Sequence, residues 1–224
     1  KHPAVLLKIF SLRQFFLFGF DVLLYFILCR TELLPGLYMT HRLEWKKEFG
    51  YSTIVCRNDN ILFIFCEGKT MKLEKCIKES FIVIGKEGST NDGEDFIKKL
   101  WEDANSHFNE VAHLAKKDDN GNILGIWGAM SDCSHLFNPW ENGFSQGLYL
   151  AGVECSDDSE APKGWTKWVL PSYEYLYIEN EDGDTFSRVI EYLQQNNIPL
   201  AGAVQEFTCP ETGKGYLFFP VKRL

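Results

Sequence analysis

The feature that most constrains the fold is a weak internal repeat, which begins near residue 77. Each copy reads as an apolar strand, an Asp-Gly turn, an amphipathic helix and two further strands. The copies match locally where NDGEDF lies beside EDGDTF, ILGIWGAM beside PLAGAVQEF, and YLAGV beside YLFFPV. One helix and three strands bury too little surface to fold alone. The repeat therefore predicts two copies that pack side by side.

The spacing of apolar residues places the elements of each copy. The first copy is expected to contain a strand over 81–85, a helical stripe from Phe96 to Ala115, and strands over 123–130 and 148–155. The second is expected to contain a strand over 173–178, a helix over 186–193, and strands over 201–208 and 216–221. The predicted class is α+β: an antiparallel sheet with the helices on one face and a ligand groove between the repeats, on the opposite face.

Charge divides the chain at about residue 70. Residues 1–70 contain nine Lys and Arg against six Asp and Glu, whereas residues 71–224 contain fourteen against twenty-five. An acidic domain has no electrostatic footprint for a phosphate backbone, so direct nucleic-acid binding is not expected. The seven cysteines form no CxxC pair, and nucleotide-loop and metalloprotease motifs are missing from the sequence. We expect free thiols in a reducing cytoplasm, and neither a cofactor nor a metal.

Residues 1–70 are predicted to be a separate N-terminal extension. The apolar run over 15–28 is shorter than a membrane span requires and contains Asp21, whose charge would be costly in lipid. One hypothesis is that translation starts at Met71, because MKLEKCIKESFIVIGKEG is typical of the start of a small domain. The alternative is that residues 1–30 are a genuine membrane anchor or an added element.

The stretches PKGWTKWVLPSYEYLYIENEDG and QEFTCPETGKGYLFFPVKR, in this order, resemble the gyrase-inhibitor-like (GyrI-like) family, also called the AraC-type effector-binding domain. The resemblance covers about residues 75–224. It implies a bacterial protein that holds lipophilic, often cationic, molecules in a groove between two repeats, with a carboxylate at its base. Some members are effector domains of transcription regulators and others stand alone. No helix-turn-helix is recognisable here, so the resemblance implies a standalone binder.

Glu206 is the residue that matches the groove carboxylate of the family. On a strand it shares a face with Val204 and Thr208. A carboxylate in an aromatic groove loses hydration, so it would select cationic ligands, or serve an enzyme as a general acid or base. Glu174 and Glu154 are the alternative carboxylates, although each also fits a solvent-exposed strand position.

Aromatic residues of the strands are candidates for the walls of the groove, where a ring facing a cation contributes about 0.5–2 kcal/mol. Core packing is the alternative role for each of them. The candidates are Trp127, Tyr149, Trp165, Trp168, Tyr175, Tyr177 and Phe219.

The loop over 131–147 carries several aromatic residues and predicts either a lid over the groove or a dimer contact. Cys133 and His135 lie two residues apart in this loop, and without a third ligand they are weak support for a nucleophile or a metal site.

Three functions fit these observations. The leading one is capture or sensing of a small lipophilic molecule, with a link to transcription regulation or to a protein partner. A second is hydrolysis of reactive, cyclopropane-bearing compounds, which some relatives are known for, with Glu206 activating water. A third is an inhibitor that docks on a partner enzyme through its acidic surface.

Overall fold

The computed structural model describes the backbone of residues 44–48, 51–58, 61–66 and 69–224, and the side chains of residues 71–224. The apolar run over 15–28 lies outside the described residues. The chain divides near residue 71 into two units, and the second contains Lys72–Leu224. In the first, β1 (Glu44–Glu48) pairs antiparallel with β2 (Tyr51–Asn58), and β3 (Ile61–Cys66) follows in sequence. Within the described residues, no helix is both long enough and apolar enough to span a membrane.

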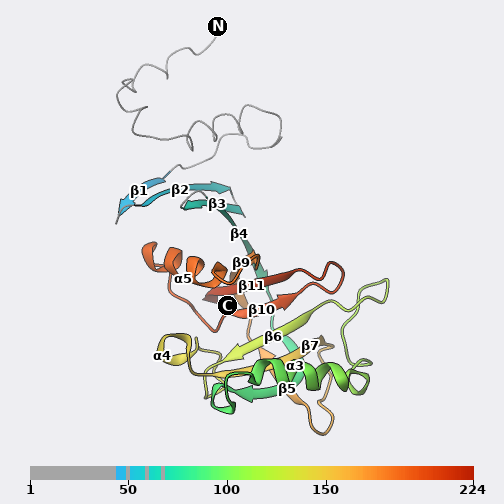
Figure 1. Ribbon diagram of the computed structural model, residues 1–224. Helices are drawn as coiled ribbons and strands as arrows, with labels where there is room; N and C mark the ends of the chain where they lie inside the picture. The colour runs from blue at the N-terminus through green and yellow to red at the C-terminus, as the bar shows by residue number, and fades with distance from the viewer. Residues whose placement is uncertain (1–43, 49–50, 59–60, 67–68) are drawn as a thin grey trace, which may run out of the picture. The chain divides into compact units, whose positions relative to one another are not determined.

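The second unit contains two copies of one strand-strand-helix-strand-strand motif (Figure 1). The first copy consists of β4 (Lys69–Lys78), β5 (Phe81–Ser89), α3 (Phe96–Ser106), β6 (Ile126–Ser131) and β7 (Leu148–Cys155), with short 3-10 turns η1 (Thr90–Asp92) and η2 (Phe108–Glu110) and a four-residue turn α4 (Glu141–Phe144). The second consists of β8 (Thr166–Leu170), β9 (Tyr173–Glu179), α5 (Thr185–Gln195), β10 (Gln205–Thr208) and β11 (Gly215–Arg223).

These strands form one antiparallel sheet in the order β4-β9-β11-β10-β6-β7-β5-β8, which confirms the predicted α+β class. The two copies meet at the centre, where β6 pairs with β10. The first strand of each copy crosses over: β4 pairs with β9 of the second copy, and β8 pairs with β5 of the first. The copies therefore exchange their edge strands, and neither copy has a complete sheet without the other.

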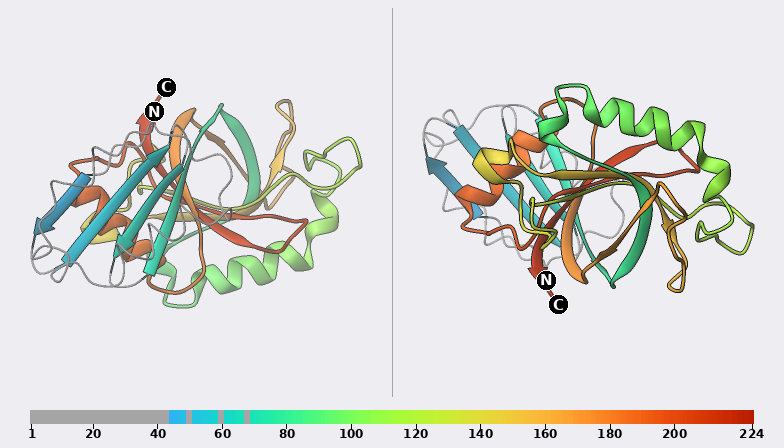
Figure 2. Two further views of the ribbon diagram at one scale, coloured as in Figure 1. Left: turned by 90° about the horizontal axis from the view of Figure 1, so that it is seen from above. Right: turned by 90° about the horizontal axis from the view of Figure 1, so that it is seen from below.

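The sheet curls because chain connections join strands from opposite ends of its order. Two residues link β4 to β5, and two link β8 to β9. The two turns meet, since the Ser80 backbone N–H donates to Ser172 Oγ at 2.8 Å and Ser80 Oγ donates to the Leu170 carbonyl at 2.9 Å. The curl is visible in Figure 2. It encloses one face of the sheet, which we call the inner face.

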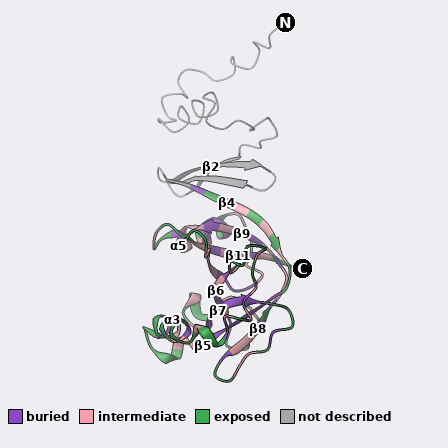
Figure 3. Ribbon diagram, turned by 90° about the vertical axis from the view of Figure 1, so that its right-hand side faces the viewer, coloured by how far each residue is buried: buried purple, intermediate pink, exposed green. Residues whose placement is uncertain are grey.

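The inner face holds an aromatic core. Its buried members include Phe81, Trp127 and Trp168, with Phe207 and Phe218 packed against them. The Trp127 ring lies 4.8 Å from that of Phe207 and 5.4 Å from that of Phe218, centroid to centroid. The opposite face, which we call the helix face, is covered by α3 and α5, which lie on the same side of the sheet in Figure 3. Helices on one face are thus confirmed.

The helix of the first copy is shorter than predicted, because α3 ends at Ser106 and not near Ala115. Side-chain groups of Ser106 and His107 bond the Asp103 carbonyl at 3.0 Å, so they compete with the next helical turn for this acceptor. The chain continues through η2, and Val111 and Ala115 are still buried. The apolar spacing was therefore correct for burial but wrong for helix length.

A buried ion pair fixes β4 across the curled sheet. Lys78 Nζ lies 3.0 Å from Glu154 Oε2 and 4.2 Å from the centre of the Phe81 ring, and Glu154 is 4% exposed. Trp127 Nε1 donates to the same carboxylate at 3.1 Å. Removal of the lysine would leave a buried charge with only partial compensation.

We predict that Lys78→Met lowers the free energy of unfolding of the full chain by about 3 kcal/mol, measured by urea unfolding. The matched control is Lys75→Met on the same strand, because Lys75 pairs with Glu174 at 2.8 Å in a more exposed setting. Exposed pairs contribute about 0–1 kcal/mol. Equal effects of the two substitutions would contradict the assignment of Lys78 as the strand's anchor.

Candidate functional site

Glu206 is the centre of a short hydrogen-bonded chain on the helix face. Tyr149 of β7 donates its hydroxyl to Glu206 Oε2 at 2.6 Å, and Trp101 of α3 donates its indole N–H to the Tyr149 hydroxyl oxygen at 3.1 Å. The second carboxylate oxygen, Oε1, makes no hydrogen bond with residues 71–224. The side chain is half-buried. Within residues 71–224, one oxygen of this carboxylate is thus left without a hydrogen bond.

The position of Glu206 corrects one expectation. The groove was predicted on the face opposite the helices, but Glu206 lies on the helix face. Glu206 pairs with Leu217, two residues from Phe219, whose ring lies 6.0 Å from that of Phe186 on α5. Tyr149 likewise faces α3. Strand alternation shows which residues share a face but not which face the helices cover. The inner face is enclosed by the curl and filled by aromatic rings instead.

Gly128 provides the room in which Tyr149 reaches Glu206. It is the direct partner of Glu206 in the β6–β10 ladder. A Cβ atom at this position would overlap the Tyr149 hydroxyl and lie 2.8 Å from Glu206 Oε2. The local sequence Trp-Gly-Ala thus places a residue without a side chain at the point where the Tyr149 phenol crosses strand β6.

The three candidate carboxylates differ in their counter-ions. Glu174 pairs with Lys75 at 2.8 Å, and Glu154 pairs with Lys78 at 3.0 Å and with Lys116 at 3.8 Å. Glu206 has no ion pair within residues 71–224, and its one polar contact there is the neutral Tyr149 hydroxyl. Of the three carboxylates, Glu206 is the one that no cationic side chain of residues 71–224 neutralises.

Burial raises the pKa of the Glu206 carboxyl above its ordinary value, and the Tyr149 hydrogen bond opposes part of this rise. The pKa of the Tyr149 hydroxyl is raised far above its usual value, mainly by burial and then by the nearby Glu206 charge. Tyr149 therefore stays protonated and remains a donor over the whole physiological pH range.

Solved structures show which fold this is. Residues of this chain superimpose on SAV2435 bound to tetraphenylphosphonium, with a TM-score of 0.50 and 15% identity over 68% of this chain and 94% of that one. The fold is GyrI-like. A proposed transcription regulation protein from Staphylococcus aureus MU50 gives a TM-score of 0.47 at 17% identity over 68% of this chain and 99% of its own.

An integron cassette protein from Vibrio cholerae gives a TM-score of 0.38 at 17% identity over 67% of this chain and 95% of its own. No protein-family model matches the sequence, and no curated protein matches it either. The GyrI-like fold is therefore established by structure alone.

Within this GyrI-like fold, the predicted wall residues fall into separate groups. Tyr149 contacts Glu206, and Phe219 lies fully buried beneath α5 on the same face. Four others are on the inner face, and they are Trp127, Trp168, Tyr175 and Tyr177. Trp165 donates to Glu110 at 2.7 Å and stacks against Lys86. Strand aromatics thus mostly build the core of the GyrI-like domain.

The loop over 131–147 is tied down along its length. Buried Asp132 accepts hydrogen bonds from the Leu136 backbone N–H and the Asn138 side chain. His135 Nε2 lies 3.1 Å from Glu87, and Cys133 is an exposed free thiol. At its far end Phe144 contacts Phe186 of α5 at 5.2 Å between ring centres. Whether this loop acts as a lid stays a prediction.

The part of the chain with described side chains, residues 71–224, contains no group of three or more His, Cys, Asp or Glu that could hold a metal ion.

Two residues of the site were missed from the sequence. Trp101 lies one turn after Ile97, on a row beside the stripe formed by Phe96, Leu100 and Ala104. An aromatic residue at the border of the apolar stripe of this helix could have been recognised as a neighbour of the site. Gly128 interrupts an apolar strand, which indicates a close approach by another group. The sequence did not say that the approaching group is Tyr149.

We predict that Gly128→Ala lowers the free energy of unfolding by about 1–3 kcal/mol and breaks the Tyr149–Glu206 bond, because the added methyl group overlaps the hydroxyl. Gly215→Ala is the control, since a Cβ there meets no atom within 4 Å. Addition of Tyr149→Phe should recover part of the loss by removing the overlapping oxygen. Urea unfolding measures all three, and a harmless Gly128→Ala would contradict this packing.

We also predict that Glu206→Gln stabilises the protein at pH 7. A carboxyl whose pKa is raised in the folded state favours folding below its unfolded pKa, and this contribution is lost as the pH rises through the folded pKa. The neutral amide avoids that loss, so its advantage should shrink as the pH falls towards 4. Urea unfolding from pH 4 to 8 tests this, with Glu174→Gln as the control. A destabilised Glu206→Gln variant at pH 7 would refute it.

Proposed function

We propose that residues 71–224 bind a small lipophilic cation on the helix face, with Glu206 as its counter-ion. The observation that carries this proposal is the contrast between the three carboxylates. Within residues 71–224, Glu154 and Glu174 are each paired with a lysine, whereas Glu206 has a phenol hydroxyl on one oxygen and no hydrogen bond on the other. A half-buried negative charge without a counter-ion attracts an external one.

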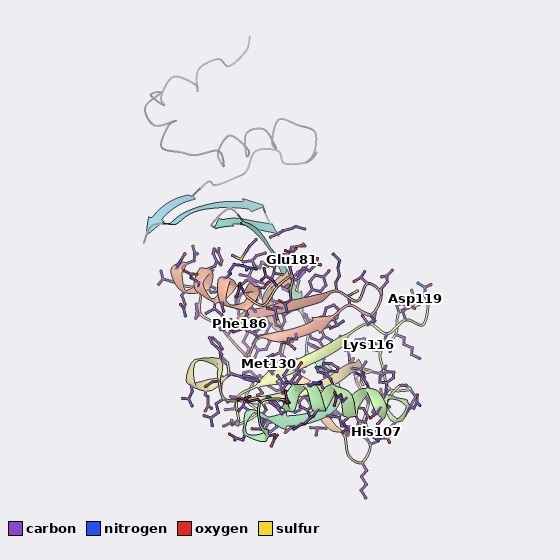
Figure 4. The ribbon with its side chains drawn as sticks, in the orientation of Figure 1. His107, Lys116, Asp119, Met130, Glu181 and Phe186 are labelled. Atoms are coloured by element: carbon purple, nitrogen blue, oxygen red, sulfur yellow. The ribbon has the colours of Figure 1, made fainter. Side chains whose placement is uncertain are left out.

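The surroundings of Glu206 favour a lipophilic cation over a hydrated one. Half-buried apolar side chains lie on the same face, from α3, β6 and α5: Trp101, Ile126, Met130 and Phe186. Figure 4 shows Met130 and Phe186 between α3 and α5. An apolar ligand surface would cover these groups, and the indole and phenyl rings add cation–π attraction of about 0.5–2 kcal/mol. A small hydrated ion would gain neither.

The solved structure of similar fold supports the same ligand class. SAV2435 is bound to tetraphenylphosphonium, a cation whose charge is surrounded by phenyl groups. Sensing of such a molecule on behalf of a transcription regulator, or of another protein partner, stays a prediction for this chain.

A second candidate function uses the same carboxylate. Because burial raises its pKa, Glu206 is better suited than an exposed glutamate to take up and return a proton near neutral pH. Hydrolysis of a reactive lipophilic compound would use that property. Product analysis of the bound ligand separates turnover from simple binding.

We predict that methyltriphenylphosphonium quenches the tryptophan fluorescence of the full chain saturably, and that Glu206→Gln weakens this binding about 10–100-fold. Triphenylphosphine oxide is the neutral ligand of similar shape, and its affinity should change less than about threefold on the same substitution, because it offers no charge to the carboxylate.

Glu174→Gln is the matched protein control, since it removes a carboxylate that already has a lysine. Equal loss for the cation and the neutral ligand would show that the carboxylate acts through the fold. Absence of binding by every ligand would refute the proposal itself.

A further inference from the structure

The two copies are related by an approximate twofold axis, and the strand registers locate it. Equivalent two-residue turns precede Phe81 of β5 and Tyr173 of β9. In the first copy, Gly85 lies four residues after Phe81. It pairs with Gly152, which in turn pairs with Trp127. In the second copy, Tyr177 lies four residues after Tyr173. It pairs with Phe218, which in turn pairs with Gln205.

Trp127 and Gln205 are therefore equivalent, and so are the next residues, Gly128 and Glu206. These two are also direct partners in the β6–β10 ladder. A residue that pairs with its own equivalent lies on the axis that relates the copies. Glu206 is thus at the junction of the two repeats, and its twin is a glycine without a side chain.

Apolar groups lie on both sides of this central carboxylate. The first copy provides Trp101 and Met130, both half-buried and packed at the border of its core cluster. The second provides half-buried Phe186 on α5, whose ring packs over Phe219, two residues from the strand partner of Glu206. A cation at Glu206 therefore has apolar surface available in two directions.

From this placement we infer that the site prefers cations whose charge lies in the middle of the molecule, with an apolar arm on either side. The inference rests on the proposed function, since it concerns the same carboxylate. A cation with its charge at one end can cover the apolar surface of only one copy, and its single long chain must bend or extend into solvent. A centrally charged cation covers both, with no increase in size.

Two isomeric ammonium ions test this preference, because they have the same charge and the same atoms. Dihexyldimethylammonium has a central charge, and undecyltrimethylammonium has a terminal one. Binding to the full chain is measured by isothermal calorimetry below the micelle-forming concentration. We expect the dihexyl isomer to bind at least about tenfold more tightly, which is a difference of about 1.4 kcal/mol.

Variants on either side of Glu206 provide the second measurement. Phe186→Ala and Met130→Ala each shorten the apolar surface of one copy, and each should weaken binding of the dihexyl isomer by at least about threefold. The undecyl isomer should respond to one of them and not to the other. Far-ultraviolet circular dichroism checks that both variants are folded.

The outcomes separate the two proposals. If neither isomer binds and methyltriphenylphosphonium does not bind either, the proposed function fails. If the isomers bind equally, or the undecyl isomer binds more tightly, the cation site stands and the central-charge preference is overturned.

Discussion

The pairing of β6 with β10 is the contact on which the rest of the domain depends. It joins two copies that exchange their edge strands, so that β4 completes the second copy and β8 the first. Gln205 strengthens this junction, because its buried side-chain amide bonds both the N–H and the carbonyl of Met130. The same pairing places Glu206 opposite Gly128. The strand pairing that joins the two copies therefore also positions the site.

The two equivalent residues on the twofold axis, Gly128 and Glu206, face each other directly, so there is room for only one large side chain. Two glutamates at 128 and 206 would bring like charges into direct contact, which is unfavourable in a half-buried setting. The copies must differ at this point even if they are alike elsewhere. Gly128 has no side chain, and the Tyr149 hydroxyl of the same copy fills the space and donates a hydrogen bond to one oxygen of Glu206. Asymmetry at the axis is thus what allows a single, oriented carboxylate.

The sequence was sufficient for the architecture, whereas it was insufficient for the face of the sheet on which Glu206 lies. Alternation placed Glu206 and Thr208 together, and the repeat predicted the α+β sheet. The exchange of β4 and β8 was not visible, because nothing local distinguishes pairing within a copy from pairing between copies. The curl that follows from it encloses the face with Trp127 and Tyr175. Aromatic content alone could not separate this core from the walls of a ligand site.

The match between the copies did not fix a register, since ILGIWGAM has eight residues and PLAGAVQEF has nine. The strand ladders supply it, because Gly128 pairs directly with Glu206. That pairing places the carboxylate on the axis. On the inner face, Glu154 shows how this chain treats a buried carboxylate that serves stability, with Lys78 and an indole N–H as permanent partners. Glu206 is also linked to an indole N–H, that of Trp101, through the Tyr149 hydroxyl, but it has no lysine partner among residues 71–224. Because an uncompensated half-buried charge opposes folding, the stability of the domain does not account for its presence at the junction, and the proposed cation would supply the missing counter-ion.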